Sequence, residues 1–243
     1  MASAAPAPSS HDLLVFLPGF MIAPAAYTTL LAPLADRGVD VLTPALYRRS
    51  PATMLGRVSC EQEAQAAAQR ISEVHTSRRP DRVWLAGHSR GGQAAWRCAN
   101  RFAEQGEDLL AGLILIDPVD GSSRTASAPD ATARPAVFTI PTLIIGAGLG
   151  GRCAPTPVNH DQFARATPAA AHVVVEQLGH ADILDGRSRA LGRRLCGGAE
   201  YPDPGRTTVS ELMTRFLRSD VAETEPPLTA SVVWRRLPGP HST

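Results

Sequence analysis

The chain has few of the features that mark membrane-spanning or nucleic-acid-binding proteins. Its 243 residues carry a formal net charge of +1, which gives no support to a nucleic-acid partner. No run of about 18 apolar residues is present, so the sequence predicts no membrane span. Residues 1–10 lack basic side chains and an apolar stretch, which predicts a disordered leader and not a signal peptide. We therefore expect a cytoplasmic protein.

Cysteine is also scarce. The four cysteines are widely spaced and contain no C-x-x-C pair, so the sequence predicts no metal site. Cys98 falls in an expected helix, where a buried thiol is the ordinary role. Cys153 and Cys196 fall in expected loops late in the chain, and the sequence leaves open whether they form a disulfide.

What the chain does contain is an alternation of short apolar segments and helical segments. Strands are expected at residues 13–17, 39–42, 81–86, 113–116, 141–145 and 173–175. Helices are expected at residues 27–37, 60–74, 92–102 and 207–217. Strands that are apolar throughout and separated by helices are typical of a parallel sheet covered on both faces. The sequence therefore predicts an α/β fold with a mostly parallel, doubly wound sheet.

The length suits one domain of this kind, and nothing in the composition requires two. We expect the domain to span residues 11–220, followed by a tail at residues 221–243 in which residues 231–236 could add an edge strand. In such sheets the functional groups gather beyond the carboxyl ends of the strands. Residues that directly follow a strand are therefore the first candidates for a site.

The most informative motif is G-H-S-R-G at residues 87–91, which fits G-x-S-x-G and lies between an expected strand and an expected helix. A serine on such a sharp strand-to-helix turn is exposed at the top of the sheet. The flanking glycines are needed because the strand and helix backbones crowd there. The motif therefore predicts Ser89 as a catalytic nucleophile.

A serine hydroxyl needs a base to accept its proton and a carboxylate to orient that base. In the α/β-hydrolase order, the acid and then the histidine follow the serine. His180 comes directly after the last core strand and is the predicted base. His88 faces away from Ser89 by strand alternation. The other histidines lie before the serine, in a loop-to-helix segment, at a strand start or in the tail: His11, His75, His160, His172 and His241.

Asp117 is the predicted acid, because it ends the strand that follows the nucleophile helix. In many α/β-hydrolases the acid comes one strand later, but here the corresponding loop, residues 146–159, contains no carboxylate. Two alternatives stay open. Asp120 lies in the same loop as Asp117, and Asp161 begins an expected helix.

An oxyanion hole is expected to use two backbone N–H groups. One belongs to Arg90, the residue after the nucleophile. The other is expected from the turn after the first core strand, P-G-F-M at residues 18–21, with Phe20 as the donor.

A second glycine-rich segment, G-A-G-L-G-G at residues 146–151, matches G-x-G-x-x-G after a strand. A dinucleotide site needs a helix to begin at the third glycine. Here the next residues, 152–157, carry two prolines, which block a helix. We therefore expect glycines that allow a close backbone approach near the site rim, not a nucleotide site.

Several of these motifs together resemble the chlorophyllases. They are G-H-S-R-G-G at 87–92, I-D-P-V-D-G at 116–121, I-G-A-G-L-G-G at 145–151, C-A-P at 153–155, V-N-H at 158–160 and G-H-A-D-I-L-D at 179–185. The matches keep their order and approximate spacing over residues 13–217. One departure is Pro18, where plant members have histidine in the oxyanion turn; the backbone donor is kept.

The resemblance implies an α/β-hydrolase fold and a serine hydrolase that cleaves the phytyl ester of chlorophyll to chlorophyllide and phytol. Carried over, the nucleophile, acid and base are Ser89, Asp117 and His180. No cofactor is implied, since the magnesium belongs to the substrate. The implied partner is chlorophyll or a related phytylated tetrapyrrole, reached by peripheral contact with a photosynthetic membrane. The plant N-terminal extension is absent from this sequence, which does not favour chloroplast import.

Two other functions fit the same residues. A general carboxylesterase or lipase-like hydrolase would use the same triad on other esters. A pigment or lipid carrier on a hydrolase scaffold would bind without turnover. For any of these ligands, residues 45–59 and 121–135 are expected to form the rim of the site.

Overall fold

The computed structural model describes residues 11–45, 59–121, 130–218 and 228–236. The predicted leader, residues 1–10, therefore lies outside the described residues. So do the middle parts of the two expected rim segments, residues 46–58 and 122–129, and most of the predicted tail. Within the described part of the chain, no helix combines the length and apolar character needed to cross a bilayer.

The core of the molecule is one seven-stranded sheet with the strand order β2-β1-β3-β4-β5-β6-β7. Every neighbouring pair is parallel except β6 and β7, which are antiparallel. The predicted mostly parallel, doubly wound sheet is confirmed. The strands are β1 (Asp12–Leu17), β2 (Asp40–Leu42), β3 (Arg82–His88), β4 (Gly112–Ile116), β5 (Thr142–Leu149), β6 (Ala171–Gly179) and β7 (Val232–Arg236).

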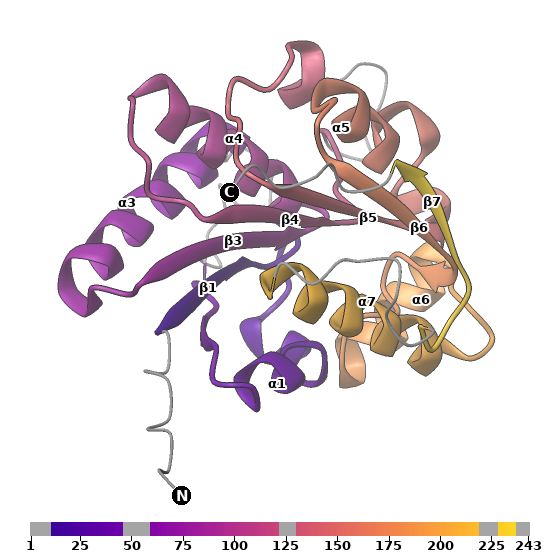
Figure 1. The fold of residues 1–243 in the computed structure, drawn as a ribbon. Helices are drawn as coiled ribbons and strands as arrows, with labels where there is room; N and C mark the ends of the chain where they lie inside the picture. Colours follow the sequence, from indigo (N-terminus) through magenta and orange to yellow (C-terminus); the bar gives the residue numbers. More distant parts are fainter. Residues whose placement is uncertain (1–10, 46–58, 122–129, 219–227, 237–243) are drawn as a thin grey trace, which may run out of the picture.

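Helices cover both faces of this sheet (Figure 1). One face carries α3 (Cys60–Arg78), α4 (Arg90–Glu104) and α5 (His160–Ala166). The other carries α1 (Thr28–Ala35), α6 (Gly186–Cys196) and α7 (Pro202–Leu217). Short 3-10 helices lie in the loops: η1 (Pro24–Tyr27), η2 (Ala131–Ala133), η3 (Gly151–Cys153) and η4 (Thr156–Val158).

The two faces explain why the central strands are apolar throughout. In β1, Leu13, Val15 and Leu17 join the core beneath α3 and α4. Leu14 and Phe16 join the core beneath α1 and α7. Side chains alternate between the faces of a strand, so every side chain of a strand covered on both sides is buried, and apolar residues are favoured at each position.

Two parts of the fold differ from the sequence-based prediction. β5 runs on to Leu149, so the G-A-G-L part of the glycine-rich segment is strand and not loop. A Cβ at Gly148 would lie 2.4 Å from the carbonyl oxygen of Glu176 in β6, so the close approach of these two strands requires glycine there. No helix was predicted where α6 lies, because Cys196 is its only buried residue and its sequence has no apolar period.

A disulfide joins Cys153, at the end of η3, to Cys196, at the end of α6. The expectation that Cys196 lies in a loop is therefore wrong. The bond closes a sequence separation of 43 residues, which restricts the unfolded chain. It fixes α6 to the loop that follows β5.

Replacing both Cys153 and Cys196 with serine is expected to lower the free energy of unfolding by about 2–4 kcal/mol, mostly because the unfolded chain gains freedom. Urea unfolding with and without a reductant measures this effect. The wild type should lose stability when reduced, whereas the double variant should not respond to the reductant. Equal unfolding midpoints for the wild type in both conditions would contradict the prediction.

Candidate active site

Ser89 occupies the sharp turn between β3 and α4 and has a positive φ of 55°. The glycines around it have no room for a side chain. A Cβ at Gly87 would lie 2.3 Å from the carbonyl oxygen of Gly91, and one at Gly91 would lie 2.2 Å from that of Leu17. The crowding that the sequence motif predicts is thus present as direct backbone contact. It raises the serine above the ends of β1 and β3.

Ser89, His180 and Asp117 form one line of hydrogen bonds. His180 Nε2 lies 2.9 Å from Ser89 Oγ, and His180 Nδ1 lies 2.6 Å from Asp117 Oδ2. A carboxylate can only accept, so Nδ1 carries the hydrogen and Nε2 is left to accept from the serine hydroxyl. The three residues follow β3, β4 and β6, at the carboxyl ends of these strands.

Asp117 is buried and held from two sides. Its other oxygen, Oδ1, accepts from the Ala147 N–H of β5 at 3.1 Å. Burial alone would raise the pKa of this carboxyl group, but the hydrogen bond with His180, the nearby His180 and His160 and the Ala147 N–H together outweigh it, and the pKa lies below its ordinary value. The group is therefore an anion in the folded protein at neutral pH.

The two alternative acids lie elsewhere. Asp120 is fully buried and accepts from Gln93 Nε2 at 2.7 Å and from the backbone and side chain of Thr132 at 2.8 and 2.6 Å. It also accepts from the Ala131 N–H at 2.7 Å. Asp120 thus anchors the start of the segment after residue 129, and Asp161 lies beside His160 and His172.

His88 faces away from Ser89, as alternation predicts, but it has a role that the sequence did not reveal. Its Nε2 lies 3.0 Å from the carbonyl oxygen of His180, to which it donates. Its Nδ1 lies 2.8 Å from Tyr27 Oη, which in turn accepts from the Gly19 N–H at 2.8 Å. A buried line of hydrogen bonds therefore joins the turn after β1 to the backbone of His180.

Burial lowers the pKa of His88 to about 3 from an ordinary 6.5, and the nearby His180 adds to the effect. The unfolded chain therefore binds a proton at this residue before the folded chain does. Stability from a neutral His88 is fully present above pH 6.5 and is lost as the pH falls toward 3, at about 1.4 kcal/mol per pH unit.

In His88→Gln, the unfolding free energy is expected to fall less steeply than in the wild type as the pH is lowered from 6 to 4. The two slopes should differ by roughly 1.4 kcal/mol per pH unit. Urea unfolding across this pH range measures the slope. His75→Gln, at a half-buried position of α3, is the control for loss of a histidine elsewhere. Parallel curves for the wild type and His88→Gln would contradict a buried neutral imidazole.

The turn after β1 lies directly against the nucleophile. A Cβ at Gly19 would lie 3.5 Å from the Ser89 Cβ. The Gly19 N–H is already bound to Tyr27, so it is not the expected oxyanion donor. The Phe20 ring lies 5.5 Å from the guanidinium of Arg90, whose Nε donates to both oxygens of the buried Glu63 at 3.0 and 2.8 Å. These contacts bring the two predicted donor residues, Phe20 and Arg90, side by side.

Residues 146–151 have no nucleotide-site geometry. The third glycine leads into the single turn of η3 and not into a longer helix. The space beside these glycines is filled by other parts of the protein. A Cβ at Gly146, for example, would lie 2.5 Å from the ring of His160.

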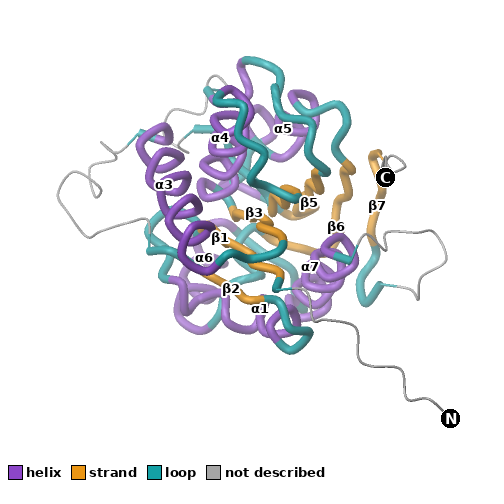
Figure 2. The backbone as a smooth tube through the Cα atoms, turned by 60° about the vertical axis from the view of Figure 1, so that its left-hand side comes forward, coloured by secondary structure: helices purple, strands orange, loops and turns teal. Residues whose placement is uncertain are grey.

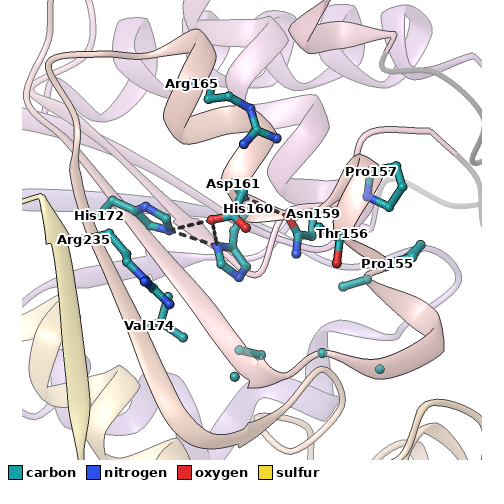
Figure 3. Close-up of a pocket in the computed structure, with 15 residues that line it drawn as sticks. Pro155, Thr156, Pro157, Asn159, His160, Asp161, Arg165, His172, Val174 and Arg235 are labelled. Atoms are coloured by element: carbon teal, nitrogen blue, oxygen red, sulfur yellow. Dashed lines mark hydrogen bonds and ion pairs between the residues drawn. The ribbon is translucent and has the colours of Figure 1, made fainter.

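A separate cavity of about 890 Å³ is lined by the end of β5, the loop after it, the start of α5 and part of β6, and neither Ser89 nor His180 lines it. Figure 3 shows His160, Asp161 and His172 in this cavity, with their ring nitrogens and carboxylate directed toward one another. These histidines, which the sequence ranked behind His180 as bases, therefore do not reach Ser89.

The family model and the curated relatives point to the same family. A sequence model described as Chlorophyllase matches residues 3–235. Chlorophyllase-1, chloroplastic, of Citrus unshiu is 31% identical over 231 residues, covering 86% of this chain and 68% of the relative. Chlorophyllase-1 of Arabidopsis thaliana is 30% identical over 197 residues, covering 72% of this chain and 60% of the relative.

Solved structures show the same fold at low identity. A structure from work on LipS and LipT, two metagenome-derived lipolytic enzymes, has a TM-score of 0.59 and 18% identity over 86% of this chain and 94% of its own. Est1E from Butyrivibrio proteoclasticus has a TM-score of 0.59 and 14% identity, covering 89% and 90%. The predicted α/β-hydrolase fold is confirmed.

Proposed function

Because this chain belongs to the chlorophyllase family, and is on that ground an ester hydrolase, we propose that it cleaves the phytyl ester of chlorophyll with Ser89 as nucleophile. The observation that supports the proposal most is the line of hydrogen bonds from Ser89 Oγ through His180 to Asp117. A hydroxyl aimed at an unprotonated imidazole nitrogen, with a carboxylate behind it, is the arrangement that acyl transfer needs.

The proposed reaction has two halves. His180 Nε2 takes the proton of Ser89 Oγ as the oxygen attacks the carbonyl carbon of the propionate ester. The tetrahedral intermediate collapses, the carbon–oxygen bond to phytol breaks, and His180 returns the proton to the departing alcohol. Water then attacks the acyl-enzyme with His180 as base, which frees chlorophyllide and restores the serine.

Other groups of the proposed site stabilise the charges that develop during the reaction. Asp117 stabilises the imidazolium that His180 becomes in each half-reaction. The backbone N–H groups of Phe20 and Arg90 are the proposed donors to the oxyanion. No cofactor takes part, and the magnesium of chlorophyll stays in the macrocycle of the substrate.

The test is hydrolysis of chlorophyll a in dilute detergent, with chlorophyllide separated from chlorophyll by phase partition and Ser89→Ala as the inactive blank. The expected result is chlorophyllide from the wild type alone. Cleavage of p-nitrophenyl butyrate without chlorophyllide would overturn the pigment assignment and leave a general carboxylesterase. Tight chlorophyll binding without turnover, unchanged in Ser89→Ala, would indicate a carrier.

We also propose that α6 makes the peripheral membrane contact that such a substrate requires. Arg187, Leu191, Arg194 and Leu195 are all exposed and recur on one side of the helix, at the spacing of successive helical turns. The two leucines are 60% and 58% exposed. Apolar side chains flanked by arginines suit the surface of a bilayer with anionic lipids. Figure 2 shows α6 on the outside of the molecule.

Replacing Leu191 and Leu195 together with serine is expected to weaken binding to phosphatidylglycerol–phosphatidylcholine vesicles roughly tenfold or more, since each buried leucine contributes about 1 kcal/mol or more. Cosedimentation with vesicles measures binding, and p-nitrophenyl butyrate hydrolysis should stay unchanged. Val137→Ser, at another exposed apolar residue, is the matched control. Unchanged vesicle binding in the double variant would exclude α6 as the contact.

A further inference from the structure

Three potential metal ligands meet in the cavity of about 890 Å³ that lies apart from the candidate active site. His160 and Asp161 come from the first turn of α5, and His172 comes from β6 (Figure 3). His160 Nδ1 lies 2.9 Å from His172 Nε2. Asp161 Oδ1 lies 3.5 Å from the first nitrogen and 3.9 Å from the second. Both imidazoles are buried, and the carboxylate is half-buried.

These separations are those of ligand atoms around one small cation. Zinc binds nitrogen and oxygen ligands at about 2.0–2.2 Å in a tetrahedron, which puts the ligand atoms about 3.3 Å from one another. We propose that His160, Asp161 and His172 bind a Zn²⁺ ion, with the fourth position open to the cavity. Two imidazoles and one carboxylate suit zinc better than Mg²⁺ or Ca²⁺, which prefer all-oxygen ligands.

The hydrogen bond between the two rings shows which hydrogen a cation must displace. In the absence of metal, one hydrogen sits between His160 Nδ1 and His172 Nε2. Zinc binding moves that hydrogen to the other nitrogen of the same ring, so both facing nitrogens offer a lone pair.

Two arginines that line the same cavity are expected to limit the affinity for Zn²⁺. Arg165 and Arg235 line it and oppose a dication, while only Asp161 offsets them within the cluster. We therefore expect binding in the micromolar range and not the tighter range of an all-cysteine structural site. The same arginines favour water or a small anion at the open position.

The three proposed ligands come from two different elements, so a bound metal ion would also stabilise the fold. A bound ion would join α5 to β6 across β5, next to Gly146, whose backbone lies against the ring of His160. The adjacent Ala147 N–H holds Asp117. Zinc should therefore stabilise the fold, and this effect does not depend on which ester the protein hydrolyses.

The test is a titration of the full chain, free of any histidine tag, with Zn²⁺ at pH 7.5 by isothermal calorimetry. One ion per chain and a higher thermal unfolding midpoint are expected. Asp161→Asn and His172→Gln should each weaken binding at least about tenfold, by removing one ligand. His75→Gln, which removes a histidine from α3, should bind as the wild type does, and Mg²⁺ should not replace zinc.

Several results would overturn the proposal. They are no zinc binding by the wild type, binding that survives both ligand variants, or equal loss of binding in His75→Gln. Asp161→Asn guards against a variant that merely unfolds, because it keeps the size of a half-buried side chain and leaves the histidine pair intact. Co²⁺ offers a second readout, since a tetrahedral site with nitrogen ligands gives it strong visible absorption that Asp161→Asn should alter.

Discussion

Alanine at position 89 is expected to reduce kcat/KM for p-nitrophenyl butyrate by about 10⁴- to 10⁶-fold, because it removes the hydroxyl that we propose forms the acyl-enzyme. Ser89 Oγ lies 2.9 Å from His180 Nε2, within hydrogen-bond distance of the proposed base. The substitution removes one oxygen atom, so the glycine contacts of the turn should persist. The remaining rate should reflect binding and the oxyanion donors alone.

The matched control is Ser72→Ala on α3, which also removes a single hydroxyl, one that donates to the Ala68 carbonyl oxygen. It should keep wild-type kinetics. Circular dichroism and urea unfolding should show that Ser89→Ala is folded. A variant that is folded and keeps more than a few per cent of the wild-type rate would show that another residue is the nucleophile.

The second large effect on kcat is expected at Asp117, the proposed acid. Asp117→Asn should lower kcat by about 10⁴-fold with little change in the fold, because the amide would favour the wrong tautomer of His180. Asp117 Oδ2 is 2.6 Å from His180 Nδ1, and an amide nitrogen at that place would donate where the carboxylate accepts. The imidazole would then present an N–H to Ser89 and could not take its proton.

Asp120→Asn is the matched comparison, since it makes the same chemical change three residues along the same loop. Asp120 accepts from Gln93, Ala131 and Thr132 and has no contact with His180, so the loss should appear in stability and not in kcat. Measuring kcat and the urea midpoint for both variants separates the roles. A larger loss of kcat in Asp120→Asn would reverse the assignment of the acid.

The sequence predicts the central part of this molecule well because its signals are local. Strands covered on both faces are apolar at every position, as in β1 and β4, so they are recognisable without alternation. The turn at Ser89 is equally local, since the glycines that it needs lie within the motif itself. His180 is marked by its place after the last core strand.

What the sequence could not predict depends on packing between distant segments. Gly148 is required by the backbone of Glu176 in a neighbouring strand, and nothing near residue 148 reveals that contact. α6 buries so little that its sequence has no apolar face to recognise. The helix is held instead by the disulfide at Cys196 and by the packing of Gly192 on Ala181.

The hydrogen-bond partners of the histidines could not be predicted from the sequence either. His88 and Tyr27 are 61 residues apart, and His160 and His172 come from different elements separated by a loop. Their hydrogen bonds exist only because the sheet brings those elements together. A sequence reading can rank these histidines as bases, but it cannot find their partners.

The strand order also determines when a functional site can exist during folding. Ser89 and His180 are 91 residues apart and follow strands that are separated in the sheet by β4 and β5. Parallel neighbours of this kind form only through contacts distant in sequence, which makes their assembly slow. Helices such as α3 can form early, whereas Ser89 can meet His180 only after β6 has docked. Recovery of hydrolysis should therefore be among the last events when the unfolded chain is returned to native conditions.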